Sequence, residues 1–223
     1  MEVNIVLAHE LKAPLATLRQ LALAFPTSGD KKSNHLRAEM ISVSERALKQ
    51  VNDLAKLARL EDGLFEMEPI AIRALCDEIK REMDYLFSYH KRGLNLKYKN
   101  KSPLVTANRD LLSSIIYNFL VNALRYSTEE TKTILSISDS KNRIRVDIRD
   151  FGPALPTKIW RDLKSGNLIE PTSVSMRPDS TGLGLYIATK FSRYMNATVG
   201  ATRHRDGTSF YIDLPISKQA SLL

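Results

Sequence analysis

Apolar residues recur every seven positions over roughly the first quarter of the chain, and this repeat limits the possible fold more than any other feature. The repeat stops at turn-forming residues over 26–30 and then resumes. It predicts two long helices, which the short turn makes antiparallel. A lone hairpin cannot bury both apolar stripes, so we expect two copies of the chain to form a four-helix bundle. The stripe consists of Leu7, Leu11, Pro14, Leu18, Leu21, Phe25, Leu36, Met40, Val43, Ala47, Gln50, Leu54 and Leu57.

The pattern changes at about Leu64. Residues 143–149 alternate apolar and charged side chains, which predicts a strand with one buried face, and residues 133–138 could pair with it. We therefore predict an α+β protein, in which an antiparallel helical hairpin over residues 1–63 forms a dimeric four-helix bundle. An α/β two-layer sandwich over residues 64–223 follows, with helices on one face of a mixed sheet. Further helices are predicted at 71–91, 110–126 and 183–195, strands at 94–99, 103–107, 198–202 and 208–214, and a long loop at 163–181.

Composition excludes several classes of protein. No run of about 18 apolar residues is present, so we expect no membrane contact by this part of the chain. The net charge of +8 favours anionic partners, but the basic residues are scattered and no nucleic-acid motif accompanies them, so we expect no nucleic-acid partner. The single cysteine, Cys76, lies in an apolar helical pattern and indicates a buried residue in a reducing compartment.

His9 and Glu10 are the first candidate for chemistry. His9 lies about 200° around the helix from Leu7 and from Leu11, so it points away from the apolar stripe. A neutral imidazole is nucleophilic at cytosolic pH, and Glu10 is placed to accept its ring proton. An ordinary surface pair of histidine and glutamate is the alternative. Pro14, kept inside the stripe at a cost of about 3 kcal/mol, favours the catalytic interpretation.

Two asparagines form the second candidate. Asn118 and Asn122 are four residues apart on a predicted helix, so their amides face the same way. Amide oxygens suit Mg²⁺, which proteins often hold with few side chains plus nucleotide phosphates. Two solvent-facing or capping asparagines remain the alternative.

Three short segments in the second half complete the pattern. Asp150 ends the alternating strand and can accept a hydrogen bond from an amino group, while Gly152 lets the backbone approach a planar ring. The glycine-rich run that ends at Leu185 precedes a helix, whose N-terminus could cradle phosphates. Thr208 opens the last strand. Taken singly, each segment is also typical of a tight turn. The glycine-rich run comprises Thr181, Gly182, Leu183, Gly184 and Leu185.

In this order and at these separations, the five segments resemble the H, N, G1, G2 and G3 boxes of sensor histidine kinases of two-component systems. The resemblance covers nearly the whole chain. It implies a dimerisation and histidine-phosphotransfer hairpin followed by a Bergerat-type ATP-binding domain. It further implies a homodimer that phosphorylates itself with ATP and Mg²⁺ and then passes the phosphoryl group to the receiver domain of a response regulator. We expect this part in the cytoplasm, and a longer protein that contains it is compatible with an inner-membrane anchor.

The resemblance also implies roles for individual residues. His9 would be phosphorylated, with Glu10 as its acid/base partner. Asn122 would bind Mg²⁺ with support from Asn118, and Arg125 would lie near the phosphates. For the base, Tyr126 would lie against adenine, Asp150 would accept its amino group, and Thr208 would lie beneath it. Gly182 and Gly184 would form the hinge of a lid.

The chain departs from the family pattern at several positions. Ala154 replaces a glycine of G1, and Ser180 replaces the first glycine of G2. The phenylalanine-bearing segment before the lid is represented only by residues 168–171. Ala13, one turn beyond His9, replaces a Thr or Asn that orients water for dephosphorylation, so we expect weak phosphatase activity. These departures leave one alternative open, a degenerate kinase that acts as a non-catalytic dimeric phosphotransfer or docking scaffold. A chaperone or topoisomerase ATPase is a further alternative, but it would lack the helical hairpin.

Overall fold

The computed structural model describes residues 15–24, 31–98, 104–140, 142–165 and 183–218. Contacts within the chain divide it into two compact units, Met1–Leu64 and Phe65–Leu223, and each is described here by itself. Among the described residues, no helix is both long enough and apolar enough to cross a membrane.

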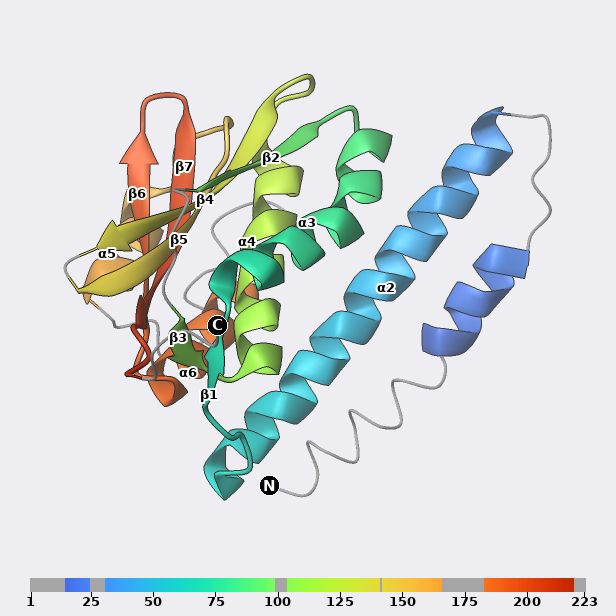
Figure 1. Cartoon of the computed structure of the whole chain (residues 1–223). Helices are drawn as coiled ribbons and strands as arrows, with labels where there is room; N and C mark the ends of the chain where they lie inside the picture. The colour runs from blue at the N-terminus through green and yellow to red at the C-terminus, as the bar shows by residue number, and fades with distance from the viewer. Residues whose placement is uncertain (1–14, 25–30, 99–103, 141, 166–182, 219–223) are drawn as a thin grey trace. The chain divides into compact units, whose positions relative to one another are not determined.

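The first unit contains a helical segment over residues 15–24 and the long helix α2, Lys31–Arg59 (Figure 1). A 3-10 turn, Leu60–Asp62, ends α2, and Gly63 adopts a left-handed φ of 67° there. Arg19 pairs with Glu45 at 3.0 Å, and Arg37 donates to the carbonyl oxygen of Leu23 at 2.9 Å, so the two helices contact each other. The predicted turn over 26–30 lies outside the described residues.

The apolar stripe of this unit is largely uncovered within one chain. Six of its side chains are among the exposed large hydrophobic residues, although helices with such a period normally bury them. The single chain does not show the predicted four-helix bundle, which requires a second copy. The exposed fractions are 49% for Leu18, 58% for Leu21, 51% for Leu36, 46% for Met40, 56% for Val43 and 37% for Leu54.

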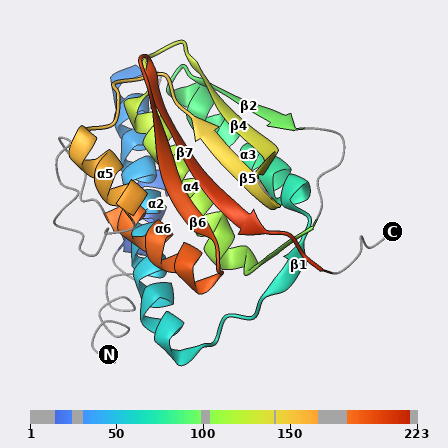
Figure 2. The same ribbon diagram turned by 90° about the vertical axis from the view of Figure 1, so that its left-hand side faces the viewer.

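The second unit is built on a five-stranded mixed sheet in the order β2-β4-β5-β7-β6 (Figure 2). Strand β2 is parallel to β4, and the other neighbouring strands are antiparallel. Along β5, buried isoleucine and valine alternate with half-buried charged residues, as the sequence predicts. The register pairs Arg149 of β5 with Ser209 of β7, so the residue after Arg149 reaches the start of β7. The strands are β2 Gly93–Tyr98, β4 Lys132–Ser140, β5 Arg143–Arg149, β6 Thr198–His204 and β7 Gly207–Pro215.

Three helices cover one face of this sheet: α3, Ile72–Tyr89; α4, Arg109–Tyr126; and α6, Leu183–Tyr194 (Figures 1 and 2). Helix α4 begins where the side-chain oxygen of Asn108 accepts the Leu111 N–H at 3.1 Å, a helix cap. The Phe119 ring stacks on Phe210 of β7, with 5.5 Å between the ring centroids. The predicted two-layer arrangement of helices on a mixed sheet is thereby confirmed.

Two short elements were not predicted from the sequence. Strand β1, Glu68–Ile70, pairs with β3, Val105–Ala107, in a separate two-stranded sheet. Helix α5, Thr157–Ser165, is helical where the predicted loop should have begun at residue 163, so that boundary was wrong. Its Ile159 and Leu163 are buried one turn apart, and the Trp160 side chain donates to the Ala201 carbonyl of edge strand β6 at 3.1 Å. Packing against β6 thus stabilises a helix too short to show a clear period. The rest of the predicted loop, residues 166–181, lies outside the described residues.

Candidate functional site

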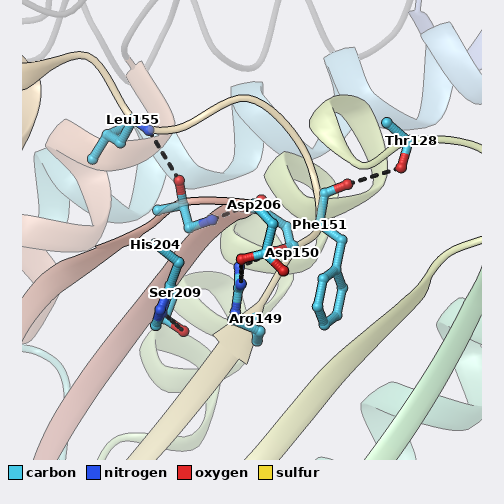
Figure 3. Close-up of polar contacts among 9 residues, drawn as sticks. Thr128, Arg149, Asp150, Phe151, Leu155, His204, Asp206 and Ser209 are labelled. Carbon is cyan, nitrogen blue, oxygen red and sulfur yellow. Dashed lines mark hydrogen bonds and ion pairs between the residues drawn. The ribbon is translucent and has the colours of Figure 1, made fainter.

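Asp150 and Thr208 form a buried pair at the end of β5 and the start of β7. Their side chains are 1% and 0% exposed. The Thr208 N–H donates to Oδ1 of Asp150 at 3.0 Å, and the Asp150 N–H donates to the Thr208 carbonyl at 2.8 Å (Figure 3). The Thr208 hydroxyl in turn accepts the Leu155 N–H at 3.1 Å. These bonds hold the Asp150 carboxylate in a fixed orientation at a buried position. A buried carboxylate without a hydrogen-bond partner would cost folding free energy.

Gly152 packs the segment after Asp150 against the end of α4. A Cβ at this position would lie 1.9 Å from the Tyr126 carbonyl oxygen, so only glycine fits without backbone movement. The neighbouring Phe151 carbonyl accepts the Thr128 N–H at 2.9 Å and the Thr128 hydroxyl at 3.1 Å (Figure 3). The predicted positions 126, 150, 152 and 208 are therefore brought together by the backbone.

The remaining predicted residues of the described region lie on α4 and α6. Asn118 and Asn122 are half-buried one turn apart on α4, and Arg125 is exposed in its last turn. At the start of α6, a Cβ on Gly184 would lie 3.6 Å from the Asn118 side chain, an ordinary packing distance. Leu183 and Leu185 follow in α6, and Leu185 is buried.

Several predicted positions fall outside the described residues. They include the proposed nucleophile and its neighbour on the hairpin and the first part of the glycine-rich run. The predictions for these positions stay predictions. The positions are His9, Glu10, Ala13, Ser180, Thr181 and Gly182.

Sequence reasoning missed a charged group beside Asp150. Arg149 is only 14% exposed, and its Nη2 lies 2.6 Å from Oδ1 of Asp206 in the β6–β7 turn. Its Nη1 donates to the Asp150 carbonyl, and its guanidinium carbon lies 4.6 Å from the Phe151 ring centroid. The alternation of β5 had assigned Arg149 to a solvated face. In the sequence, only its place directly before Asp150 could have indicated a role for Arg149 at the site.

Gly207 is the second residue whose importance emerges only from the structure. It adopts a φ of 143°, in the region that favours glycine. A Cβ there would lie 2.2 Å from the Asp150 carbonyl oxygen and 2.6 Å from Nη1 of Arg149. The end of β5 and the start of β7 therefore approach each other so closely that a side chain at position 207 would not fit.

Burial, hydrogen bonds and neighbouring charges shift the pKa values of several groups on β5 and β6. Burial raises the pKa of the Asp147 carboxyl, and a hydrogen bond from Ser209 and the Arg145 charge oppose that shift. The pKa of His204 is lowered by burial and then by the charge of Arg149. Arg145 donates two bonds of 2.7 Å to Asp213, and this hydrogen bonding is the largest cause of the raised pKa of Arg145.

Metal ligation within the described region depends on few side chains. No group of three or more His, Cys, Asp or Glu side chains that could hold a metal ion occurs there. A divalent ion at this site would therefore need oxygen ligands from a bound phosphate in addition to amides such as that of Asn122.

Residues 107–218 match the family described as histidine kinase-, DNA gyrase B-, and HSP90-like ATPases. The chain belongs to this family. The adaptive-response sensory kinase SasA of Synechocystis sp. is 24% identical over 225 residues, covering 95% of this chain and 58% of SasA. The signal transduction histidine-protein kinase BarA of Escherichia coli is 27% identical over 233 residues, covering 97% of this chain and 25% of BarA. The chain thus belongs with the histidine kinases of two-component systems and contains a catalytic ATP-binding domain, and it spans only part of the length of these relatives.

Solved structures show the same fold. Full-length ShkA, crystallised in complex with AMPPNP, superimposes with a TM-score of 0.71 at 23% identity, covering all of this chain (100%) and 47% of ShkA. The Acinetobacter baumannii histidine kinase AdeS superimposes with a TM-score of 0.61 at 20% identity, covering 94% of this chain and 98% of AdeS.

Proposed function

We propose that this kinase phosphorylates its own His9 with ATP and then transfers the phosphoryl group to an aspartate of a response regulator. The observation that carries the proposal is the buried Asp150 carboxylate, which the Thr208 main chain holds on the ATPase sheet. A buried acceptor of this kind suits a ligand that presents an amino group. The five sequence segments and the family support the phosphotransfer chemistry.

For the base, Asp150 would accept a hydrogen bond from the exocyclic amino group of adenine. Gly152 would allow the ring to approach the backbone, and Tyr126 would contact the ring from the end of α4. This assignment is supported by the tight contact between Gly152 and the Tyr126 carbonyl, since it brings the three positions to one place.

For the phosphates, the first turn of α6 would supply backbone N–H groups. Arg125 would add a positive charge from the last turn of α4. Mg²⁺ would be held by the Asn122 amide oxygen, with Asn118 in support, and would neutralise charge on the phosphates. The described residues fit this assignment because Asn118 and Asn122 offer amide oxygens one turn apart on α4.

In the transfer step, a ring nitrogen of His9 attacks the γ-phosphorus of ATP. A nitrogen–phosphorus bond forms, the bond to the β–γ bridging oxygen breaks, and ADP leaves with that electron pair. Glu10 would take the proton from the other ring nitrogen. An aspartate of the regulator would then attack the same phosphorus and restore the imidazole.

A homodimer would cover the exposed stripe of the first unit. Leu21 and Val43 are 58% and 56% exposed in one chain, an arrangement that a second hairpin would relieve. The proposed partners are therefore a second copy of this chain and the receiver domain of a response regulator.

The test is incubation with ATP labelled on the γ-phosphate, followed by acid and alkali treatment of the labelled protein. We expect an acid-labile, alkali-stable label that His9→Gln abolishes without loss of nucleotide binding. His35→Gln, which changes the other histidine of the hairpin, is the matched control and should keep the label. Asn122→Ala should remove Mg²⁺-dependent labelling. Nucleotide binding without any label in the unmodified protein would contradict the proposal and favour a docking scaffold.

A further inference from the structure

Arg149 joins three groups that converge where β5 ends. Its guanidinium pairs with Asp206 in the β6–β7 turn, donates to the Asp150 carbonyl, and lies over the Phe151 ring (Figure 3). The arginine side chain is 14% exposed, whereas that of Asp206 is 68% exposed. The pair therefore differs from a surface ion pair between two solvated side chains, which contributes little.

The main-chain carbonyl oxygens of Asp150 and Phe151 both accept hydrogen bonds. Arg149 binds the first carbonyl, and Thr128 binds the second through its N–H and hydroxyl. Gly207 leaves the space that the guanidinium shares with the Asp150 carbonyl, because a Cβ there would lie 2.6 Å from Nη1 of Arg149. The direction of the Asp150 carboxylate is thereby coupled to the position of the β6–β7 turn.

We propose that the Arg149–Asp206 pair is a positioning device that orients Asp150 and so sets the preference of this kinase for adenine over other purines. The inference rests on the proposed role of Asp150 as acceptor for the adenine amino group. Recognition of a base by one buried carboxylate needs positioning to about 0.5 Å. Asp150 is fixed on its N-terminal side by Thr208 and on its C-terminal side by Arg149. Asp206 keeps the guanidinium in place, and neither charged residue touches the base.

A matched control lies on the same two strands. Arg145 lies four residues before Arg149 on the same face of β5 and forms two bonds of 2.7 Å to Asp213. Its guanidinium carbon lies 3.7 Å from the centroid of the Tyr211 ring. Loss of this pair should affect the stability of the sheet as much as loss of the Arg149 pair, but it should not alter base selection.

The experiment compares dissociation constants for ADP and inosine diphosphate, which carries a carbonyl oxygen where adenine carries its amino group. Arg149→Gln and Asp206→Asn are expected to weaken ADP binding about 2- to 10-fold, because a misplaced Asp150 carboxylate would keep only part of its hydrogen bond to the amino group. Both variants should leave inosine diphosphate binding unchanged. Arg145→Gln should leave the ratio of the two constants as in the unmodified protein. Arg149→Lys should give a ratio between those of Arg149→Gln and the unmodified protein. The reason is that an ammonium group keeps the charge but cannot reproduce the planar guanidinium contacts.

Asp150→Asn separates failure of this inference from failure of the proposed function. If Asp150→Asn leaves the ratio unchanged, the adenine role of Asp150 is wrong. If Asp150→Asn makes the two dissociation constants equal but Arg149→Gln and Asp206→Asn leave their ratio unchanged, the positioning role alone is overturned. Equal weakening of both nucleotides by Arg149→Gln would also overturn it. Asp206→Asn keeps the test valid should Arg149→Gln not fold, since Asp206 is largely exposed.

Discussion

Replacing Thr208 by valine tests how the buried carboxylate is held. Valine keeps the shape and strand preference of threonine but has no oxygen to accept the Leu155 N–H. That N–H lies in a buried environment, where Thr208 Oγ1 accepts it at 3.1 Å. The substitution leaves the main-chain bonds between Thr208 and Asp150 possible and removes only this third bond.

The expected cost follows from the burial of the unpaired donor. A buried N–H that loses its acceptor costs about 1–3 kcal/mol. For a chain of 223 residues, each kcal/mol lowers Tm by about 2–4 °C. Because the Leu155 N–H ties the segment after Gly152 to β7, that segment should also loosen. We therefore expect Thr208→Val to weaken ADP binding several-fold as well.

Urea unfolding and ADP titration, both repeated on Thr208→Ser, provide the measurement. Serine keeps the acceptor and loses one methyl group, for about 1 kcal/mol of stability. It should therefore retain ADP affinity where valine loses it. Equal ADP affinity for the two variants, or unchanged stability of Thr208→Val, would refute the role given to the hydroxyl.

Two further predictions follow from the environments of one cysteine and two glycines. Burial, and secondarily the charge of Asp77, raises the pKa of Cys76 to about 12 from 9.0. The contribution of Cys76 to stability is thus fully present below about pH 9 and is lost as the pH rises through about 12, since only the unfolded thiol ionises in between. Urea unfolding at pH 7 and pH 10 should show this loss, and Cys76→Ala should reduce it. Gly152→Ala should abolish ADP binding because its methyl would meet the Tyr126 carbonyl, whereas Gly184→Ala has room beside Asn118 and should bind ADP. Equal behaviour of the two alanine variants in an ADP titration would argue against the steric reasoning.

The sheet was predictable because its pattern repeats. Strand β5 alternates over its whole length, so the buried and solvated faces could be assigned without knowledge of its neighbours. Helix α5 was missed because its apolar face is defined by only Ile159 and Leu163, which a short window cannot distinguish from chance. The bundle could be predicted only as a property of two chains, and it stays a prediction because one chain, in which Leu21 and Val43 are exposed, does not show it.

Motifs supplied the candidate site residues, but they did not supply the contacts that support these residues. The order of the segments identified Asp150 and Thr208, and the structure places them in hydrogen-bonding contact. No periodic pattern relates Arg149 to Asp206, because they meet through the β6–β7 turn, 57 positions apart along the chain. Contacts of this kind depend on tertiary register, which local sequence patterns do not encode.

The two units differ in what one chain can complete by itself. In the second unit, the Asp150 carboxylate and the Thr208 hydroxyl both find hydrogen-bonding partners within the same sheet and its loops. In the described part of the first unit, apolar side chains such as Leu18 and Met40 remain 49% and 46% exposed. The polar groups at Asp150 and Thr208 are therefore paired within one chain, whereas the apolar stripe of the proposed phosphotransfer hairpin remains partly exposed. Base selection can thus be a property of a single chain, whereas the hairpin that carries His9 needs a second surface to cover its apolar stripe.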